Sequence, residues 1–460
     1  MVVCKTFVTP YGKYVYDRNK NDLIRISETE FECIENNEFD SPILHTLKEK
    51  RYLEESMIEE IQHPQCRNVQ HFLQNRLFHM ILQVTQNCNL RCSYCAYSGS
   101  YEHRAHSNLR MDFETAKKAI DLLIENSVEN NVIALGFYGG EPMLEMELIK
   151  KCVYYTKEKV KDKKIVFSMT TNGTLLTDSN IRFIKEYDFQ ILISLDGTKE
   201  DHDINRKFVN GKGSFDVIMK NVKHIKENYP EFMNNISFNA VLNPKSNYSC
   251  VRDYFFTNEV VLESSFMMNI IADEHRKKED ISFDAAFHLA RAYDYFLLIM
   301  SMLKKCDEKL VPRAVLEQKR GIHSFYDQLK DIGCVGKKCH HGGPCIPGGK
   351  RVFVSTKGEM YPCEKVPEVN VMSIGNLEYG FNLDNIKKLM NIGKISDKQC
   401  KGCWAFIYCT QCVNQVVDKE QLSQSAKLKH CPEAKDIAQR GFEQILLLKE
   451  LGYDFEEELL

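Results

Sequence analysis

Cysteine is the residue type that most constrains how this chain folds. The 460 residues include 18 cysteines, and most of them fall into two groups, one at 88–95 and one at 339–431. A secreted disulfide scaffold is short and spreads its cysteines through loops, whereas clustered thiols in a long chain of a reducing compartment act as metal ligands or redox centres. The spacing therefore predicts a metalloprotein of the cytoplasm.

Composition and charge narrow the choice of partners. Hydrophobic residues make up 43% of the chain and charged residues 27%, which is enough to build a large core. The 61 Lys and Arg residues nearly balance the 64 Asp and Glu residues, so we expect neither nucleic acid nor an anionic membrane as partner. The start of the chain lacks the pattern of a signal peptide, and the most apolar stretch, 295–303, is shorter than the roughly 20 residues of a membrane span.

Residues 78–300 alternate between apolar β-rich runs and amphipathic helical stretches at 113–125, 147–159 and 215–227. Connections this long require parallel strands. Six such units fit an α/β fold with a partial TIM-like (β/α)6 barrel better than a closed eight-stranded barrel. Functional residues are then expected at the carboxyl ends of the strands. The predicted strands are 79–85, 132–138, 165–170, 190–195, 236–242 and 266–271.

Four other segments flank this barrel. Residues 1–75 show three short alternating runs, then Ser27 and Glu30 in the spacing of a capping box, then a second helical stretch at 43–57. We expect residues 301–333 to form a helical bridge and residues 436–460 a C-terminal helix. Residues 334–435 carry the second cysteine group with little periodicity, so we expect bound metal to order them.

The first cysteine group has the spacing C-x3-C-x2-C and follows the first predicted strand. Three thiolates from Cys88, Cys92 and Cys95 on a four-iron cluster leave one iron without a protein ligand. An open metal position can bind a substrate. Tyr94, directly before the third cysteine, can stack on a purine. The alternatives are a three-thiol zinc site and cysteines of an ordinary core.

This motif resembles the signature of the radical S-adenosylmethionine (SAM) superfamily. The resemblance implies that Cys88, Cys92 and Cys95 are catalytic and hold a 4Fe-4S cluster, whose open iron binds the amino and carboxylate groups of SAM. One electron from the reduced cluster then cleaves SAM and yields a 5′-deoxyadenosyl radical. The cofactor carries the difficult chemistry, and the protein positions it.

Residues after the second and third predicted strands match further elements of that superfamily. Gly139, Gly140, Glu141 and Pro142 resemble the GGEP element that receives the SAM amino group. The two glycines allow a close approach of the backbone, and Glu141 or exposed carbonyls accept from an ammonium. Asn172, in the stretch TTNG, is expected to bind a ribose or a carboxylate.

The fourth and fifth predicted strands add candidates for the same site. Ser194 and Asp196 offer a hydroxyl and a carboxylate at the same end of the sheet. Arg206 supplies a guanidinium that suits bidentate capture of the SAM carboxylate; its alternative is a surface ion pair. Asn239 and Val241 are expected to form the adenine wall, although an apolar strand residue is more often part of the core.

The second cysteine group resembles the SPASM extension of radical SAM enzymes. One departure is that two residues separate Cys409 from Cys412, where the pattern has three. The resemblance implies two auxiliary 4Fe-4S clusters, three clusters in all. A zinc ribbon is the alternative, because C-x2-C pairs also bind zinc. The implied ligand sets are Cys339, Cys345, Cys363 and Cys412 for one cluster, and Cys400, Cys403, Cys409 and Cys431 for the other.

The whole chain most resembles the maturases of cysteine-rich ribosomal peptides, of the ranthipeptide and sactipeptide type, which form thioether cross-links. The resemblance rests on the stretches TPYGKYVYD, LQVTQNCNLRCSYCAYS, GFYGGEPM, TTNGTLL and ISLDG. It implies that residues 1–75 are a winged-helix-like domain that binds the leader of a precursor peptide by adding a strand to a sheet edge. The alternative for this segment is a stabilising appendage.

The implied reaction joins a cysteine sulfur of the precursor to a carbon of an acceptor residue. The radical removes a hydrogen, a peptide thiolate held at an auxiliary cluster closes on the carbon, and an auxiliary cluster accepts the surplus electron. A flavodoxin- or ferredoxin-like protein is the expected reductant. Two other functions compete: a sulfatase-maturase-like enzyme that forms formylglycine, and a non-catalytic iron–sulfur electron carrier.

Overall fold

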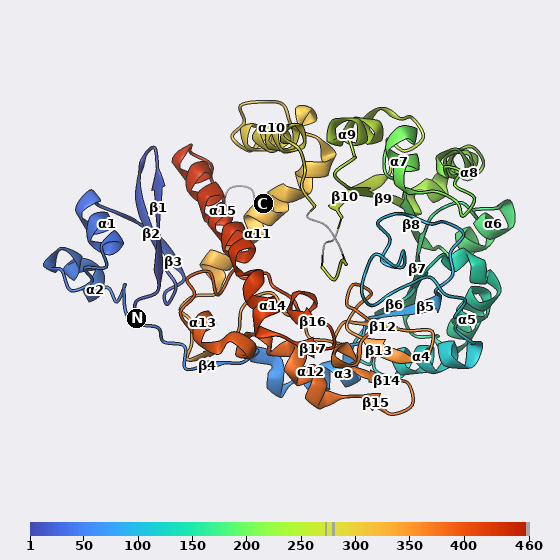
Figure 1. Ribbon diagram of the computed structural model, residues 1–460, viewed down its shortest axis with the longest axis horizontal. Helices are drawn as coiled ribbons and strands as arrows, with labels where there is room; N and C mark the ends of the chain where they lie inside the picture. Colours follow the sequence, from blue (N-terminus) through green and yellow to red (C-terminus); the bar gives the residue numbers. More distant parts are fainter. Residues whose placement is uncertain (272–273, 278–280, 457–460) are drawn as a thin grey trace. The chain divides into compact units, whose positions relative to one another are not determined.

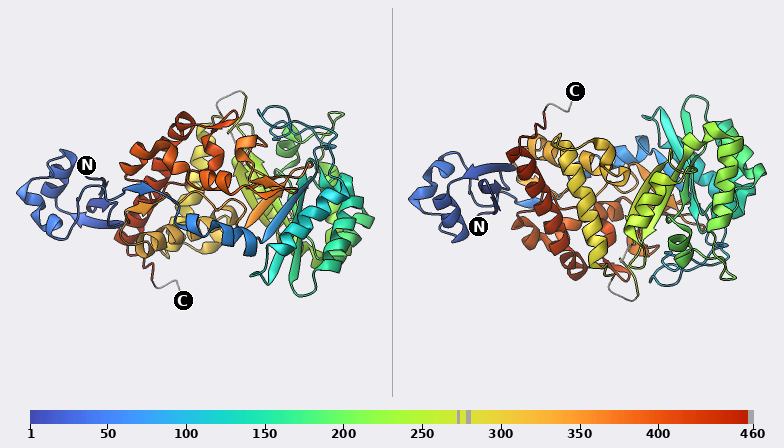
Figure 2. Two further views of the ribbon diagram at one scale, coloured as in Figure 1. Left: turned by 90° about the horizontal axis from the view of Figure 1, so that it is seen from below. Right: turned by 90° about the horizontal axis from the view of Figure 1, so that it is seen from above.

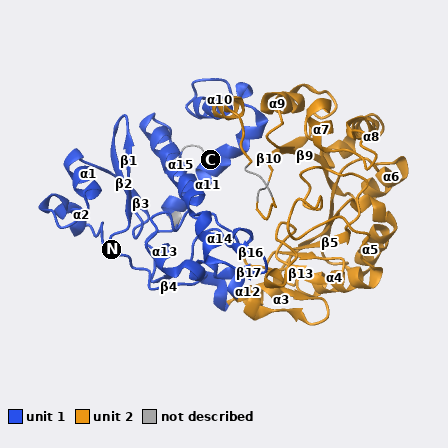
Figure 3. Cartoon of the chain, viewed as in Figure 1, with its two compact units in different colours: residues 1–67, 293–345, 388–460 blue, residues 68–292, 346–387 orange. Residues whose placement is uncertain are grey.

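The computed structural model describes residues 1–271, 274–277 and 281–456 (Figure 1). The chain forms two compact units (Figure 3). One unit comprises residues 1–67, 293–345 and 388–460, and the other comprises residues 68–292 and 346–387. Each unit combines segments that are far apart in the sequence.

A ten-stranded sheet organises the second unit, in the order β10-β9-β8-β7-β6-β5-β12-β13-β14-β15. Neighbours from β10 to β12 pair in parallel. All six predicted strands are confirmed within one residue at each end, and so is the α/β class. They are β5 (His79–Thr85), β6 (Val132–Gly139), β7 (Lys164–Thr171), β8 (Gln190–Ser194), β9 (Ile236–Leu242) and β10 (Ser265–Ile270).

Helices connect these strands and lie along the sheet (Figures 1 and 2). Side chains at the helix starts accept backbone N–H groups, such as Asp112 before α4 and Thr198 before α7. The three helical stretches expected in this region are confirmed as α4, α5 and α8. The helices are α3 (Val69–Asn75), α4 (Phe113–Glu125), α5 (Met146–Lys159), α6 (Asp178–Glu186), α7 (Lys199–Asn205), α8 (Phe215–Asn228) and α9 (Tyr248–Thr257).

The cysteine-rich segment extends this sheet, which the sequence did not predict. Strand β12 (Arg351–Val354) pairs in parallel with β5, with Arg351 opposite His79. The antiparallel strands β13 (Glu359–Tyr361), β14 (Gly375–Asn376) and β15 (Gly380–Phe381) follow. Strands of two to four residues are too short to show a recognisable period in the sequence. Backbone pairing thus orders part of a segment that we expected bound metal to order.

The first unit begins with a three-stranded antiparallel sheet of β1 (Cys4–Thr9), β2 (Gly12–Asp17) and β3 (Asp22–Ile26). The predicted capping box is present, because Ser27 accepts from the Glu30 N–H and Glu30 accepts from the Ser27 N–H at the start of α1 (Glu28–Glu35). The helix predicted at 43–57 was wrong in its extent. The chain forms η1 (Pro42–Leu44) and α2 (His45–Glu49), then leaves the helix where Arg51 and Leu53 adopt φ of 62° and 60°.

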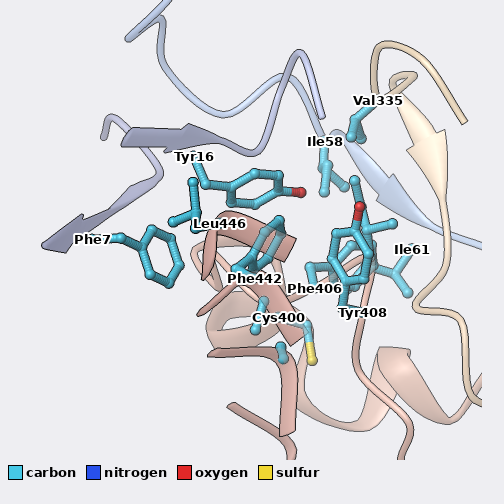
Figure 4. Packing of buried hydrophobic residues seen from close by; sticks show 13 residues of the cluster. Phe7, Tyr16, Ile58, Ile61, Val335, Cys400, Phe406, Tyr408, Phe442 and Leu446 are labelled. Carbon is cyan, nitrogen blue, oxygen red and sulfur yellow. The ribbon is translucent and has the colours of Figure 1, made fainter. Parts of the chain in front are cut away.

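An aromatic cluster packs this sheet against the last helix, α15 (Cys431–Glu450) (Figure 4). The ring centroid of Phe442 lies 4.4 Å from that of Tyr16 and 5.4 Å from that of Phe7. Burying one such side chain stabilises a fold by roughly 1.5–3 kcal/mol. The other helices and strands of this unit include β4 (Glu60–Ile61), α11 (Arg313–Asp331), β11 (Lys338–Cys339), α13 (Asp397–Lys401), β16 (Val417–Asp418), β17 (Gln421–Leu422) and α14 (Gln424–Lys429). Helices α10 (Ala285–Met302) and α12 (Leu383–Met390) each begin in the second unit and end in this one.

Among the described residues, none of the helices combines the length and apolarity that a membrane span requires.

Candidate metal centres

Three thiols of the first cysteine group lie together on the loop that follows β5. Cys88, Cys92 and Cys95 belong to one apolar cluster with Leu90 and Tyr94. Burial raises the pKa of the Cys88 thiol to about 12 and that of Cys92 to about 11, and the neighbouring thiols add to the rise. Such thiols lose their protons when a cation binds them. Their burial and proximity therefore fit an iron–sulfur cluster, which would be held by these three residues.

The glycines after β6 let the backbone approach this loop closely. A Cβ atom on Gly139 would lie 2.1 Å from the carbonyl oxygen of Thr85, and one on Gly140 would lie 2.0 Å from that of Asn87. Gly139 also has a φ of 134°, which L-residues with a side chain rarely adopt. These positions therefore require glycine, as expected from the sequence.

Glu141 joins the ends of two strands. Its side chain is fully buried, and its carboxylate accepts the N–H of Met143 at 3.0 Å, the hydroxyl of Thr171 at 2.7 Å and the N–H of Asn172 at 2.8 Å. Burial raises the pKa of this carboxyl group, while these three donors oppose the rise. The structure thus gives Glu141 a positioning role that its motif does not reveal, and a contact with the SAM ammonium stays a prediction.

The side chain of Asn172 lies beside the first cluster thiol. Its Nδ2 donates to Oδ1 of Asn89 at 2.8 Å and lies 3.7 Å from Sγ of Cys88, while its Oδ1 accepts the N–H of Thr174 at 3.0 Å. Sequence reasoning missed Asn89 and Thr174 as partners of this amide. The position of Asn89 inside the cysteine motif was the available signal.

Asp196 is the centre of a buried polar network. Its Oδ2 accepts from Nε of Arg206 at 2.9 Å and from the hydroxyl of Tyr94, and its Oδ1 accepts the N–H of Val241 at 2.9 Å. The guanidinium of Arg206 also lies over the ring of Tyr94, 5.3 Å from its centroid. Arg206 is therefore not a surface ion pair, because its side chain is 7% exposed. The sequence predicted these residues singly and not their pairing.

The remaining predicted contacts lie at the same end of the sheet. Ser194 ends β8 and stands opposite Asn239 of β9. The Oδ1 of Asn239 accepts from Nδ2 of Asn269 on β10 at 2.7 Å. Pro142 is buried at the start of a 3-10 turn after β6. The structure thus places every predicted SAM contact on this unit, and their binding roles stay predictions.

Four cysteines of the second group line one cavity in the first unit. Cys400, Cys403, Cys409 and Cys431 surround a space of about 170 Å³. Burial raises the pKa of Cys409 to about 11. These four thiols fit an iron–sulfur cluster, which would be held by the four residues.

Three polar groups lie at hydrogen-bond distance from sulfur atoms of this set. The ammonium of Lys427 and the hydroxyl of Ser396 each lie 3.2 Å from Sγ of Cys400, and Nε2 of Gln411 donates to Sγ of Cys431 at 3.5 Å. Hydrogen bonds to sulfur are a feature of iron–sulfur sites. Sequence reasoning missed these residues, because a lysine in a short polar helix has the pattern of a surface residue.

The other implied ligand set is divided between the two units. Cys339, Cys345 and Cys412 belong to the first unit, and Cys363 belongs to the second. Burial raises the pKa of Cys339 to about 11, and the guanidinium of Arg18 opposes the rise. This second auxiliary site stays a prediction.

Comparison with known proteins agrees with this geometry. Residues 82–256 match the model of the radical SAM superfamily. A cysteine-type anaerobic sulfatase-maturating enzyme of Clostridium novyi is 34% identical over 344 residues, which cover 72% of this chain and 86% of that enzyme. An uncharacterised protein of Methanocaldococcus jannaschii is 41% identical over 136 residues, 30% of this chain and 44% of that protein.

Solved structures share the fold. Native anSMEcpe with bound AdoMet has a TM-score of 0.57 at 20% identity, over 79% of this chain and 99% of that chain. The same protein with AdoMet and the Cp18Cys peptide has a TM-score of 0.55 at the same identity and coverage. The family match and the 34% identity with the sulfatase-maturating enzyme of Clostridium novyi show that this chain belongs to the radical SAM superfamily. Within it, this enzyme belongs to the sulfatase-maturase group, and its family implies a 4Fe-4S cluster and SAM as cofactors.

Proposed function

We propose that this enzyme installs thioether cross-links, from cysteine sulfur to a carbon of an acceptor residue, in a ribosomally synthesised cysteine-rich precursor peptide. The observation that carries the proposal is the small sheet of β1, β2 and β3. Among the described residues β3 is an edge strand that pairs only with β2. Its second edge can therefore take up an extended peptide as an additional strand.

The edge formed by β3 suits a leader peptide better than the edge formed by β1. Backbone groups beside the start of β1 already have partners, because the N–H of Ser56 donates to the carbonyl of Met1 at 3.1 Å and Val2 forms an antiparallel bridge with Glu55. The bound peptide in one of the similar solved structures supports a peptide as the substrate class. A leader held at β3 tethers the core of the precursor to the enzyme and raises its local concentration.

The residues around Cys88, Cys92 and Cys95 would position the cofactors and shield the radical from water. With its cluster and SAM bound, the site supplies a 5′-deoxyadenosyl radical, which removes a hydrogen atom from the peptide. Gly139 and Gly140 allow the backbone to approach, and Glu141 fixes the strand ends. The apolar neighbours of the thiols, among them Leu90, Phe208 and Ile271, exclude water from the reactive group.

Thioether formation removes two hydrogens from the peptide. One leaves as a hydrogen atom to the 5′-deoxyadenosyl radical, and the other leaves as a proton together with one electron. The second cysteine group would hold two auxiliary 4Fe-4S clusters, which would supply the acceptor for this electron. The electron that cleaves SAM comes from a flavodoxin- or ferredoxin-like reductant. The four thiols around the cavity at Cys400 support one of these clusters.

A second candidate function is the oxidation of a cysteine or serine to formylglycine. The observation that favours it is the 34% identity with the sulfatase-maturating enzyme of Clostridium novyi. Both reactions use one hydrogen abstraction and one electron acceptor, so the metal centres do not distinguish them. The chemical nature of the peptide product distinguishes the two reactions.

The test is mass spectrometry of a cysteine-rich peptide encoded beside this gene, after anaerobic incubation with enzyme, SAM and dithionite, followed by iodoacetamide. The proposal predicts a product that retains all its sulfur, has lost two hydrogens per ring and has one fewer alkylated thiol per ring. Loss of sulfur from a cysteine, or a new aldehyde with every thiol still alkylated, assigns the enzyme to formylglycine formation. A control reaction with Cys88→Ala is expected to leave the peptide unchanged.

A further inference from the structure

Lys427 is a lysine buried inside the first unit. It lies on α14, and its side chain is 1% exposed. Removing an ammonium from water is costly unless an anionic or polar partner replaces the lost hydration. The sequence does not predict this burial. Lys429, the other lysine near the end of α14, is exposed.

The partner of this ammonium is a thiol. Its Nζ lies 3.2 Å from Sγ of Cys400, and no carboxylate among the described residues lies within ion-pair distance of it. The nearest ion pairs along the chain, Lys401–Asp397 and His430–Glu433, leave Lys427 out. A neutral thiol is a weak acceptor, whereas a thiolate is the anion that a buried ammonium requires.

The cavity provides the place for that anion. Lys427 lines it together with Cys400, Cys403, Cys409 and Cys431. A cluster bound by four thiolates carries net negative charge, and it gains a further negative charge when it is reduced. A positive charge at hydrogen-bond distance in a low-dielectric interior therefore stabilises the reduced form more than the oxidised form.

We infer that Lys427 is a positioning residue that donates to the Cys400 sulfur and raises the reduction potential of an iron–sulfur cluster at Cys400, Cys403, Cys409 and Cys431. This inference deepens the proposed function, since it rests on a cluster in this cavity, but it does not depend on which peptide product forms. A raised potential makes this cluster a better acceptor for the electron that the peptide releases.

The test is a redox titration of the reconstituted enzyme, followed by electron paramagnetic resonance, in a Cys88→Ala background that removes the signal of the SAM-binding cluster. Three variants are compared: Lys427→Met, which keeps the length and loses the charge; Lys427→Arg, which keeps the charge; and Lys429→Met, which removes an exposed charge from the same helix. Iron and sulfide are counted for each protein.

The inference predicts that Lys427→Met shifts the midpoint of one signal to more negative potential at unchanged iron content, and that Lys427→Arg and Lys429→Met stay close to the parent. An unchanged midpoint in Lys427→Met overturns it. If Lys427→Met loses about four irons, retention of the cluster in Lys427→Arg supports the electrostatic role, and its loss there overturns that role in favour of simple packing.

The same experiment keeps the two proposals apart. A parent protein without a cluster in this cavity overturns the inference, whatever product the enzyme makes. A shifted midpoint together with a formylglycine product leaves the role of Lys427 intact and overturns thioether formation. A thioether product together with an unchanged midpoint in Lys427→Met supports thioether formation and overturns the role of Lys427.

Discussion

The backbone N–H of Asn172 donates to Oε2 of Glu141 at 2.8 Å, which ties the carboxyl end of β7 to that of β6. Asn172 in turn places its side-chain amide beside Cys88. The carboxylate thus acts on the cluster loop through another residue. This relationship explains why a fully buried acidic residue follows two glycines beside the metal centre.

Replacing Glu141 by Gln tests this positioning role. The NH2 group of the new amide faces either the N–H of Met143 or that of Asn172, so at least one buried donor loses its acceptor. Such a loss costs about 1–3 kcal/mol, and we expect 5′-deoxyadenosine formation to fall by roughly 10- to 100-fold. Glu147→Gln, an exposed change on α5, serves as the control. Turnover of Glu141→Gln at the level of this control would show that the three hydrogen bonds do not matter.

The buried pair of Asp196 and Arg206 is expected to stabilise the second unit. Asp196→Asn removes the partner of a guanidinium that cannot lose its charge, and breaking a buried pair costs about 3–5 kcal/mol. We expect the thermal midpoint to fall by roughly 6 °C or more, together with weaker SAM binding. Asp216→Asn breaks the exposed pair with Lys199 and is expected to change neither quantity measurably. Equal midpoints for the two variants would contradict the account.

His202 makes stability depend on pH. Burial, followed by the charge of Arg206, lowers its pKa to about 4, and its ring nitrogens bond to the Asp196 N–H and the Ser214 hydroxyl. The folded-state pKa lies below the unfolded value of about 6.5. The contribution of neutral His202 to the free energy of unfolding is therefore complete above pH 6.5, and it is lost as the pH falls toward 4.

At pH 5.5 this loss amounts to about 1.4 kcal/mol. We expect the thermal midpoint of the wild-type enzyme to fall between pH 7 and 5.5, and that of His202→Gln to fall less over the same interval. The slope is the decisive quantity, because the substitution also changes stability at neutral pH. Parallel slopes for the two proteins would show that His202 does not remain neutral in the folded state.

Leader binding at β3 predicts a local change in hydrogen exchange. Adding the leader segment of the precursor should slow amide exchange in residues 22–26, because their outward N–H groups gain partners. Exchange in the central strand β2 should change little, since both its edges are already paired. Deleting the segment is a poorer test, because it would expose Phe442. Protection confined to the other unit would place the leader elsewhere.

Sequence patterns predicted the barrel well because its signals are local. Each of the six strands is an apolar run bounded by turn residues, and the capping box at Ser27 lies within four residues. The short strand β12 was missed, because its pairing with β5 joins residues more than 250 positions apart. The helix at 43–57 was overextended, since the left-handed backbone at Arg51 and Leu53 has no strong sequence signal.

The site shows the same contrast between local signals, which the sequence reveals, and contacts that depend on the fold. Motifs identified Cys88, Glu141 and Arg206 one by one, but not that Glu141 bonds to Asn172 or that Arg206 pairs with Asp196. Those contacts depend on the register of neighbouring strands. Lys427 carried no signal at all, because its burial depends on how α14 packs beside four cysteines.

The central claim is that one chain combines a SAM-cleaving cluster with two auxiliary clusters. The most direct measurement is anaerobic reconstitution, with iron and sulfide counted and 5′-deoxyadenosine assayed after addition of SAM and dithionite. The account predicts about twelve irons per chain and formation of 5′-deoxyadenosine, with neither the full iron content nor turnover in Cys88→Ala. About four irons with turnover would contradict the auxiliary clusters, and iron without turnover would assign the chain to electron transfer.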